Sequence, residues 1–213
     1  MAMPRPMPMF PLESTLLPGE ELPLRIFEPR YSALVRDCLD SDDPVFGVVL
    51  IERGREVGGG DDRSDIGVLA RIATFEDHGD GRYLLRCLLS ERIRVVEWLP
   101  DDPYPRAIVM PWPDEPGEVA DADMRDVEDR IVALFERIAT ARGGRLPERE
   151  VLVGSGHAGD AGKRLYDLAT RLPMGAADRY TLLAAPSPAQ RLVALREAVE
   201  TITAMVEFQL SGD

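Results

Sequence analysis

The sequence predicts an α+β protein in which a β-rich N-terminal half precedes a bundle of helices. Two observations support this prediction. Up to about Trp112 the chain consists of short apolar runs separated by turn residues, and beyond that point apolar residues recur at helical spacing. Three prolines between positions 111 and 116 separate these two patterns. We therefore expect a β-rich subdomain over 1–115 and a helical subdomain over 118–213, with strands and helices segregated along the chain.

Four segments of the first half are typical of β-strands. The apolar run 46–51 does not alternate with polar residues, which indicates a strand buried on both faces. Segments 66–75 and 104–110 are further candidates, and 83–98 suits one or two strands. Between them, 76–82 contains two glycines that can adopt positive φ, so it predicts a hairpin connection.

One helix is expected inside the β-rich half. Pro29 suits a first helical turn, and Tyr31, Leu34, Val35 and Leu39 follow at helical spacing. Segment 57–65, rich in Gly and Asp, predicts a loop, and the first nine residues form a low-complexity run of Met and Pro.

The second half predicts about four helices. Apolar stripes run from Val127 to Ile138 and from Leu192 to Val206, and Ser187-Pro188 offers a capping serine and a first-turn proline for the latter helix. Segments 164–172 and 177–184 suit shorter helices. We interpret the stripes as packing faces.

Composition limits the classes of function. The formal net charge is -13, which disfavours binding to nucleic acid or to anionic membranes. Cys38 and Cys87 form no Cys-x-x-Cys pair, and the two histidines show no metal-ligand spacing. We expect both thiols to be reduced and partly buried. No apolar signal segment and no run of ~20 apolar residues is present, so we expect a cytoplasmic protein.

Several motifs suggest chemistry, but their context contradicts each of them. Residues 154–159 match the G-x-G-x-x-G dinucleotide pattern, yet the flanking sequence is helical and no second strand completes a βαβ unit. Gly162-Lys163 is followed by Arg164 where a P-loop requires Ser or Thr. The acidic run 121–129 lacks the central glycine of a Ca²⁺ loop and suits the start of a helix. We expect no catalytic residues, no cofactor and no metal.

Segment 17–31 is the most distinctive part of the chain. Together with Phe-Pro-Leu at 10–12, it resembles the opening of the Lon protease N-terminal domain family, where a pattern of the form FPL…PG…LPL.IFEPRY leads into the first helix. Segment 46–51 is similar to the FGVVLI strand of that family, 57–59 to its glycine loop and 66–72 to its GT.A.I strand.

The similarity continues to the closing helices and so covers nearly the whole chain. One departure is the absence of the glycine that many relatives carry ahead of the R.RV strand, where this chain has 89–91 as Leu-Ser-Glu. The resemblance implies a PUA-like β pseudo-barrel with one embedded helix, followed by a helical bundle. Such a module recognises polypeptides destined for degradation in bacteria.

The same resemblance implies that this chain is not an enzyme. Full-length Lon proteases continue into an ATPase module and a Ser–Lys peptidase domain, and the sequence contains neither the P-loop nor the dyad. The expected partners are unfolded or exposed apolar polypeptide segments. Two alternatives remain open: an adaptor whose helical tail docks on a separate protease or chaperone, and a sensor that binds a small molecule in a barrel pocket. The oligomeric state is not predicted.

We place the polypeptide-binding site on two segments that flank a groove, namely Phe27, Glu28, Arg30 and Tyr31 with Val57, Gly58 and Gly59. A glycine loop beside a packed barrel offers an adaptable surface. In this hypothesis Arg30 pairs with a carboxylate and Tyr31 supplies an amphipathic contact. The alternative is structural: the segment turns a strand into a helix, and Glu28 and Arg30 hold that turn.

Overall fold

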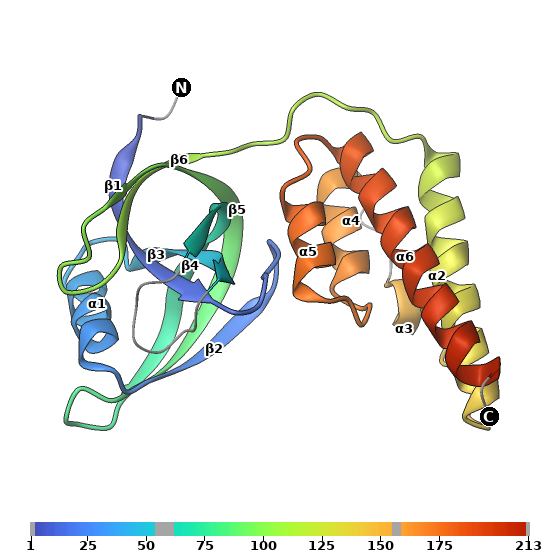
Figure 1. Cartoon of the computed structure of the whole chain (residues 1–213), viewed down its shortest axis with the longest axis horizontal. Coiled ribbons are helices and arrows are strands. Elements are labelled where there is room, and N and C mark those ends of the chain that lie inside the picture. Colours follow the sequence, from blue (N-terminus) through green and yellow to red (C-terminus); the bar gives the residue numbers. More distant parts are fainter. Residues whose placement is uncertain (1–2, 54–61, 155–158, 212–213) are drawn as a thin grey trace. The chain divides into compact units, whose positions relative to one another are not determined.

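The computed structural model describes residues 3–53, 62–154 and 159–211 (Figure 1). The chain divides into two compact units, Met1–Pro113 and Asp114–Asp213, which we call the β unit and the helical unit. In the described ranges the β unit holds six strands and one helix, and the helical unit holds five helices. No helix in these ranges is long and apolar enough to cross a bilayer.

A single mixed sheet forms the β unit, in the order β2-β5-β4-β3-β1-β6. Its β6 also pairs with β5, so five strands close into a ring and β2 extends the sheet beyond it. Only β1 and β3 run parallel among the pairs of the described residues. In chain order the elements are β1 (Arg5–Leu12), β2 (Glu21–Ile26), α1 (Pro29–Leu39), β3 (Val45–Arg53), β4 (Asp62–Asp77), β5 (Tyr83–Leu99) and β6 (Arg106–Pro111).

The Met/Pro run at the N-terminus is part of β1, which the sequence did not indicate. Met7 and Met9 are buried in the core of the ring, together with Val45, Val49, Leu69, Ile93, Val95, Ala107 and Val109. Residues 5–8 of β1 pair with β6 and residues 9–12 pair with β3. The backbone N–H of Met9 donates to the Pro105 carbonyl on the β6 side. Because this direction alternates along a strand, the backbone nitrogens of Pro6 and Pro8 face the opposite side, where pairing with β3 has not yet begun. These prolines therefore interrupt no hydrogen bond of the ladder.

The four predicted strands of the β unit are confirmed, with shifts at their ends, whereas β2 was not predicted. The predicted loop 57–65 is wrong in part, because β4 begins at Asp62; residues 57–61 lie outside the described residues. Segment 83–98 is one long strand, and β3 is buried on both faces along most of its length. Gly67 of β4 lies against β3 so closely that a Cβ atom there would be 2.2 Å from the Val48 carbonyl oxygen. The close pairing of β4 with β3 thus depends on a residue without a side chain at this position.

Helix α1 has the predicted bounds, with Pro29 in its first turn. The hairpin between β4 and β5 is also confirmed: Gly79, Asp80 and Gly81 all have positive φ, of 75°, 53° and 74°. The Ser32 hydroxyl donates to the Gly81 carbonyl and so joins α1 to this hairpin.

The helical unit contains α2 (Asp121–Ala141), α3 (Arg149–Val153), α4 (Ala161–Ala169), α5 (Ala176–Leu183) and α6 (Pro188–Ser211). Ser187 accepts a hydrogen bond from the Gln190 N–H at 3.3 Å, as expected of an N-cap. One correction concerns the number of helices, because about four were predicted and residues 149–153 form an additional one, α3. This short helix packs on α2 and buries Leu152 and Val153, a tertiary contact that outweighs the weak local helical signal.

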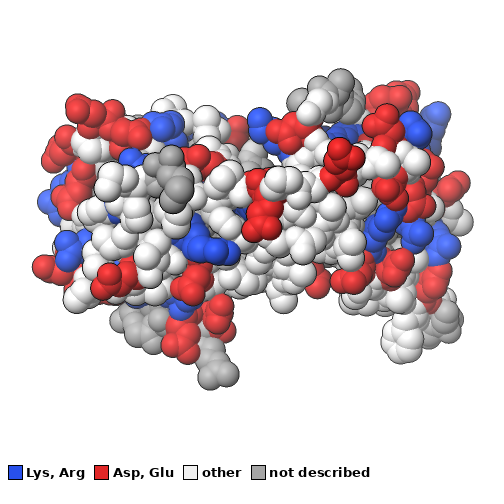
Figure 2. All heavy atoms as spheres, turned by 90° about the horizontal axis from the view of Figure 1, so that it is seen from above, with Lys and Arg blue, Asp and Glu red and all other residues white. Residues whose placement is uncertain are grey.

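Ion pairs connect α2 and α6, which run parallel. Arg196 lies 3.1 Å from Asp126, Arg130 lies 3.0 Å from Glu200, and Arg137 pairs with Glu207. In all three pairs the partners are 70 residues apart, so the helices keep one register. Figure 2 shows the resulting mixture of basic and acidic side chains over the helical unit.

Arg191 is the most deeply buried arginine of the helical unit among the described residues. The Arg191 side chain is 0% exposed and donates to Asp114 at 3.0 Å and to the Gly162 carbonyl at 3.2 Å. Its guanidinium also lies 4.0 Å from the centroid of the Tyr166 ring. This side chain therefore connects the segment before α2, the start of α4 and the start of α6.

Candidate functional site

A depression of about 400 Å³ lies where the end of β2 meets the β4–β5 hairpin. The register of β2 and β5 forms it, because Ile26 is opposite Tyr83 and Arg25 is opposite Leu84. Ile26 and Tyr83 are buried and make its floor. The depression is lined by Arg25, Ile26, Phe27, His78, Arg82, Tyr83 and Leu84.

Phe27 is the most exposed apolar side chain at this depression, at 60%. Its position follows from the local structure: Ile26 ends β2 with its side chain in the core, and Pro29 begins α1 two residues after Phe27. Leu84 is 37% exposed because the side chains of β5 alternate between core and solvent in this region. Two apolar groups from distant parts of the sequence are thereby placed on one rim.

The remaining predicted residues of this segment have different environments. Arg30 Nε lies 3.1 Å from Glu28 Oε2, and these side chains are only 17% and 18% exposed. The Arg30 guanidinium is 4.5 Å from the Tyr31 ring centroid, and Tyr31 itself is 4% exposed and stacks on Phe10 at 4.2 Å. The Tyr31 ring is thus part of the core. Of the four predicted residues, Phe27 is the one whose side chain lines the depression.

Val57, Gly58 and Gly59 lie outside the described residues, so their role in binding stays a prediction. Conversely, the structure brings His78, Arg82 and Leu84 to Phe27, and the sequence analysis did not identify them as site residues. The sequence offered little signal for Leu84, because residues 83–85 are all apolar and only the sheet decides which of them face solvent.

The rim of the depression carries three groups that can be cationic. His78 Nε2 lies 3.4 Å from Glu76, and Arg82 lies 3.5 Å from Asp80. Arg25, by contrast, has no ion pair with any residue of the described ranges. A guanidinium beside exposed apolar groups suits contact with the backbone carbonyls or carboxylates of a bound chain.

The other features that suggested chemistry lack the required geometry. Both cysteines are buried free thiols, and burial raises the pKa of each to about 12. Such thiols stay protonated near neutral pH and are poor nucleophiles. The G-x-G-x-x-G motif begins at Gly154, directly after helix α3, whereas a dinucleotide fold requires a strand there.

Three comparisons identify related proteins. Residues 6–201 match the family model described as the ATP-dependent protease La (LON) substrate-binding domain. The structure is similar to the crystal structure of a Lon N-terminal domain protein from Xanthomonas campestris, with a TM-score of 0.66 and 29% identity over 91% of this chain and 98% of that chain. It also shares its fold with the N-terminal domain of a Mycobacterium avium complex Lon protease, with a TM-score of 0.62, 15% identity and 92% and 98% coverage of the two chains.

Two longer proteins align with about half of this chain. Lon protease 2 of Myxococcus xanthus is 36% identical over 108 residues, and a Lon protease of Anaeromyxobacter dehalogenans is 32% identical over 106 residues. These alignments cover 50% and 49% of this chain but only 13% and 12% of the relatives. Because the family model extends over most of its length, this chain belongs to the LON substrate-binding domain family.

Proposed function

We propose that this chain is a non-catalytic module that binds exposed apolar segments of other polypeptides at the depression beside Phe27. The observation that carries the proposal is the 60% exposure of Phe27 at the rim of this depression, next to Leu84. Apolar side chains clustered around a concave surface are typical of interaction sites. Membership of a family named for substrate binding supports the same conclusion.

The finer description of the fold belongs to the same proposal. The closed ring formed by the pairing of β5 with β6 supports a PUA-like pseudo-barrel, with α1 as its embedded helix. The absence of enzymatic activity is proposed on the state of the side chains. The two cysteine thiols are buried and protonated, and the His78 side chain is 51% exposed beside Glu76. A general base requires a fixed and partly desolvated position, which this histidine lacks.

Fluorescence anisotropy of a labelled polypeptide, kept unfolded by reduction and alkylation of its cysteines, tests the proposal. The purified protein is titrated into the probe without ATP, and the probe is recovered afterwards on a gel. We expect saturable binding and an uncleaved probe. A flat titration up to high protein concentration would contradict polypeptide binding, and fragments of the probe would contradict the non-catalytic assignment.

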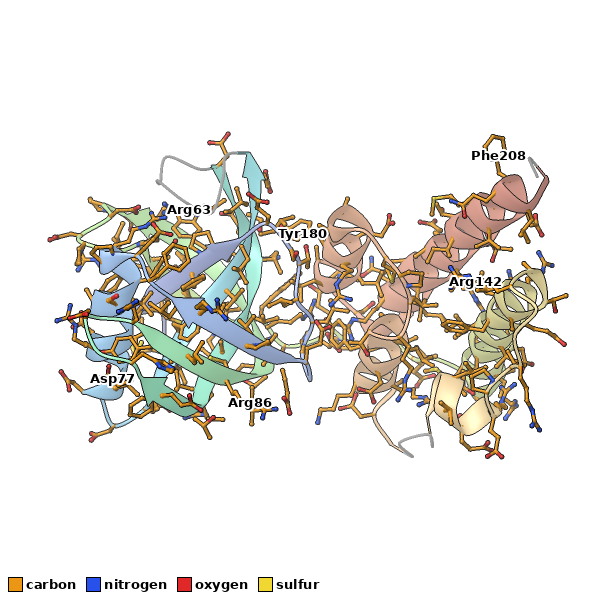
Figure 3. All side chains as sticks on the ribbon, turned by 90° about the horizontal axis from the view of Figure 1, so that it is seen from below. Arg63, Asp77, Arg86, Arg142, Tyr180 and Phe208 are labelled. Atoms are coloured by element: carbon orange, nitrogen blue, oxygen red, sulfur yellow. The ribbon has the colours of Figure 1, made fainter. Side chains whose placement is uncertain are left out.

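A second candidate function is docking on a separate protease or chaperone through the end of α6. Met205, Phe208 and Leu210 are 50%, 79% and 47% exposed there, and Figure 3 shows Phe208 pointing away from the helix. Phe208→Ser should then weaken binding to a purified Lon protease that lacks its own N-terminal domain, measured by biolayer interferometry. Affinity for the unfolded probe should stay unchanged. Equal binding of wild type and variant to the protease would remove this candidate.

A further inference from the structure

Strand β2 has a strand neighbour on one side only. It pairs with residues 83–88 of β5, while β6 pairs with residues 93–99 of the same strand. Within the described residues of the β unit, no strand lies along the other edge of β2. An edge of this kind presents backbone N–H and C=O groups in the pattern that an added strand requires.

The hydrogen-bond direction along β2 identifies the groups on its open edge. Leu89 N–H donates to the Glu20 carbonyl at 2.9 Å, so residue 20 faces β5. Because this direction alternates, residues 22, 24 and 26 also face β5, and Glu21, Pro23 and Arg25 direct their backbone groups outward. The open edge therefore offers three carbonyl acceptors but only two N–H donors, since Pro23 has none.

We propose that a client polypeptide binds by adding an extended segment to this open edge of β2. The inference rests on the proposed function and specifies its mode of recognition. The edge leads at Arg25 directly into the depression lined by Phe27 and Leu84, so a side chain of the added strand can enter that depression. The backbone of the client is held by the edge, and its side chains are selected by the depression.

This geometry defines the class of client. Five residues, from Glu21 to Arg25, form the edge, so the bound segment is about 17 Å of extended chain at ~3.3 Å per residue. It must expose its own N–H and C=O groups, which excludes folded surfaces and proline-rich segments. One apolar side chain fits beside Phe27, and the unpaired Arg25 guanidinium favours an acidic residue or a carboxylate nearby.

Pro23 also explains why the occupant is a client and not a second copy of this chain. If the β2 edges of two copies paired, two prolines would lie in one short ladder. The ladder would then have four backbone N–H donors for six carbonyl acceptors. A client without proline supplies a full set of donors. Proline on an exposed edge is a known means of preventing self-association of sheets.

Two substitutions at position 25 distinguish the contribution of the backbone N–H to binding from that of the side chain. Arg25→Pro and Arg25→Ala both lose the guanidinium, but only the proline loses the outward N–H. Pro23 is already accommodated two residues earlier on the same edge, so a proline at 25 is compatible with pairing to β5. We expect the alkylated probe to bind Arg25→Pro about fivefold more weakly than Arg25→Ala, the effect of one backbone hydrogen bond.

Pro23→Val gives the converse test, because it adds a third donor to the edge. It should bind the probe about threefold to fivefold more tightly than wild type. Tryptophan fluorescence during denaturant unfolding checks that each variant is folded. If Arg25→Pro does not fold, the Pro23→Val result decides alone.

The two proposals fail in distinguishable ways. Equal affinities of Arg25→Pro and Arg25→Ala, with no gain for Pro23→Val, would overturn strand addition while binding by wild type persists. Lack of binding by wild type would overturn the proposed function itself. A fivefold difference between the two position-25 variants, together with tighter binding by Pro23→Val, would establish strand addition.

Discussion

Both units of this chain pair arginines with carboxylates, but in the described residues the β unit also leaves polar groups unpaired at the edge of β2. In the helical unit, arginines of α2, α4 and α6 pair with carboxylates of neighbouring segments, as Arg130 does with Glu200 and Arg164 with Glu128 at 2.5 Å. In the β unit, Arg25 and the outward backbone of β2 have no partner of this kind in the described residues. Polar groups that the fold itself satisfies contribute to stability, whereas groups left open at an edge are available to a ligand.

The same contrast holds for apolar side chains. Those of the β unit that stay exposed include Phe27 and Leu84, which meet at one depression. In the helical unit three exposed apolar residues lie at the end of α6, while Val151 and Val193 are exposed elsewhere. The depression between α2 and α6 combines paired charges such as Arg130 and Glu200 with apolar residues. We therefore propose that the β unit recognises the client and that the helical unit has a mainly structural role in this recognition.

The largest expected effect is on the helical unit. Arg191→Met removes a fully buried guanidinium and its hydrogen bonds to Asp114 and Gly162. It should lower the free energy of unfolding by about 4 kcal/mol, since the buried Gly162 carbonyl and the partly buried Asp114 carboxylate both lose their donor. Circular dichroism at 222 nm reports on the helices, and fluorescence reports on the β unit, where both tryptophans lie.

The control for this experiment is the fluorescence transition of the same variant. We expect the midpoint of the transition followed at 222 nm to shift to a lower denaturant concentration and that of the fluorescence transition to stay unchanged. The affinity for the unfolded probe should be retained. A loss of probe binding by folded Arg191→Met would show that the helical unit takes part in recognition, contrary to our assignment.

Gly67→Ala is the matching perturbation of the β unit. The added methyl group would lie 2.2 Å from the Val48 carbonyl oxygen, so β4 must move away from β3. We expect a loss of about 3 kcal/mol, at the upper end of overpacking effects. The tryptophan transition should shift and the helical transition should not. If both transitions shift together, the two units unfold cooperatively and the comparison between them no longer holds.

A smaller effect is expected from Glu28→Gln combined with Arg30→Gln. This pair is mostly buried and Arg30 covers the Tyr31 ring, so its loss should destabilise the β unit by about 1 kcal/mol. Probe affinity, measured well below the melting temperature, should change less than twofold. An unchanged melting temperature with abolished binding would instead place these two side chains in the binding site.

The smallest effect is predicted for the ion pairs between α2 and α6. Arg137 and Glu207 are 49% and 56% exposed, and exposed pairs contribute little. Arg137→Gln should stay within about 0.5 kcal/mol of wild type in denaturant unfolding followed at 222 nm. A loss above 1 kcal/mol would indicate that these pairs act as a cooperative network.

Much of the fold was predictable because local signals and tertiary structure agree. The bounds of α1 follow from Pro29 and its apolar spacing, and the β4–β5 hairpin follows from its glycines. β1 was missed because a run of Met and Pro carries no strand signal. Its prolines are tolerated only because the strand changes partners midway, a property of the sheet that no local pattern encodes.

The candidate site was predictable only in part for a similar reason. Phe27 lies within the most distinctive segment and was identified, whereas Arg82 and Leu84 join it through the register of β2 and β5. That register is a property of the assembled sheet, which no local sequence pattern encodes. Tyr31, by contrast, was predicted as a site residue, but the structure places its ring against Phe10 in the core. An amphipathic residue in a motif can equally be a core residue.

The measurement that tests the central claim most directly is the affinity of Phe27→Ser for the unfolded probe, compared with that of Phe75→Ser. Both phenylalanines belong to the β unit and are similarly exposed, at 60% and 51%, but only Phe27 lines the depression. We expect Phe27→Ser to bind about tenfold more weakly, the loss of part of one buried aromatic side chain, and Phe75→Ser to bind as wild type. Equal weakening by both variants, or by neither, would contradict a binding site at Phe27.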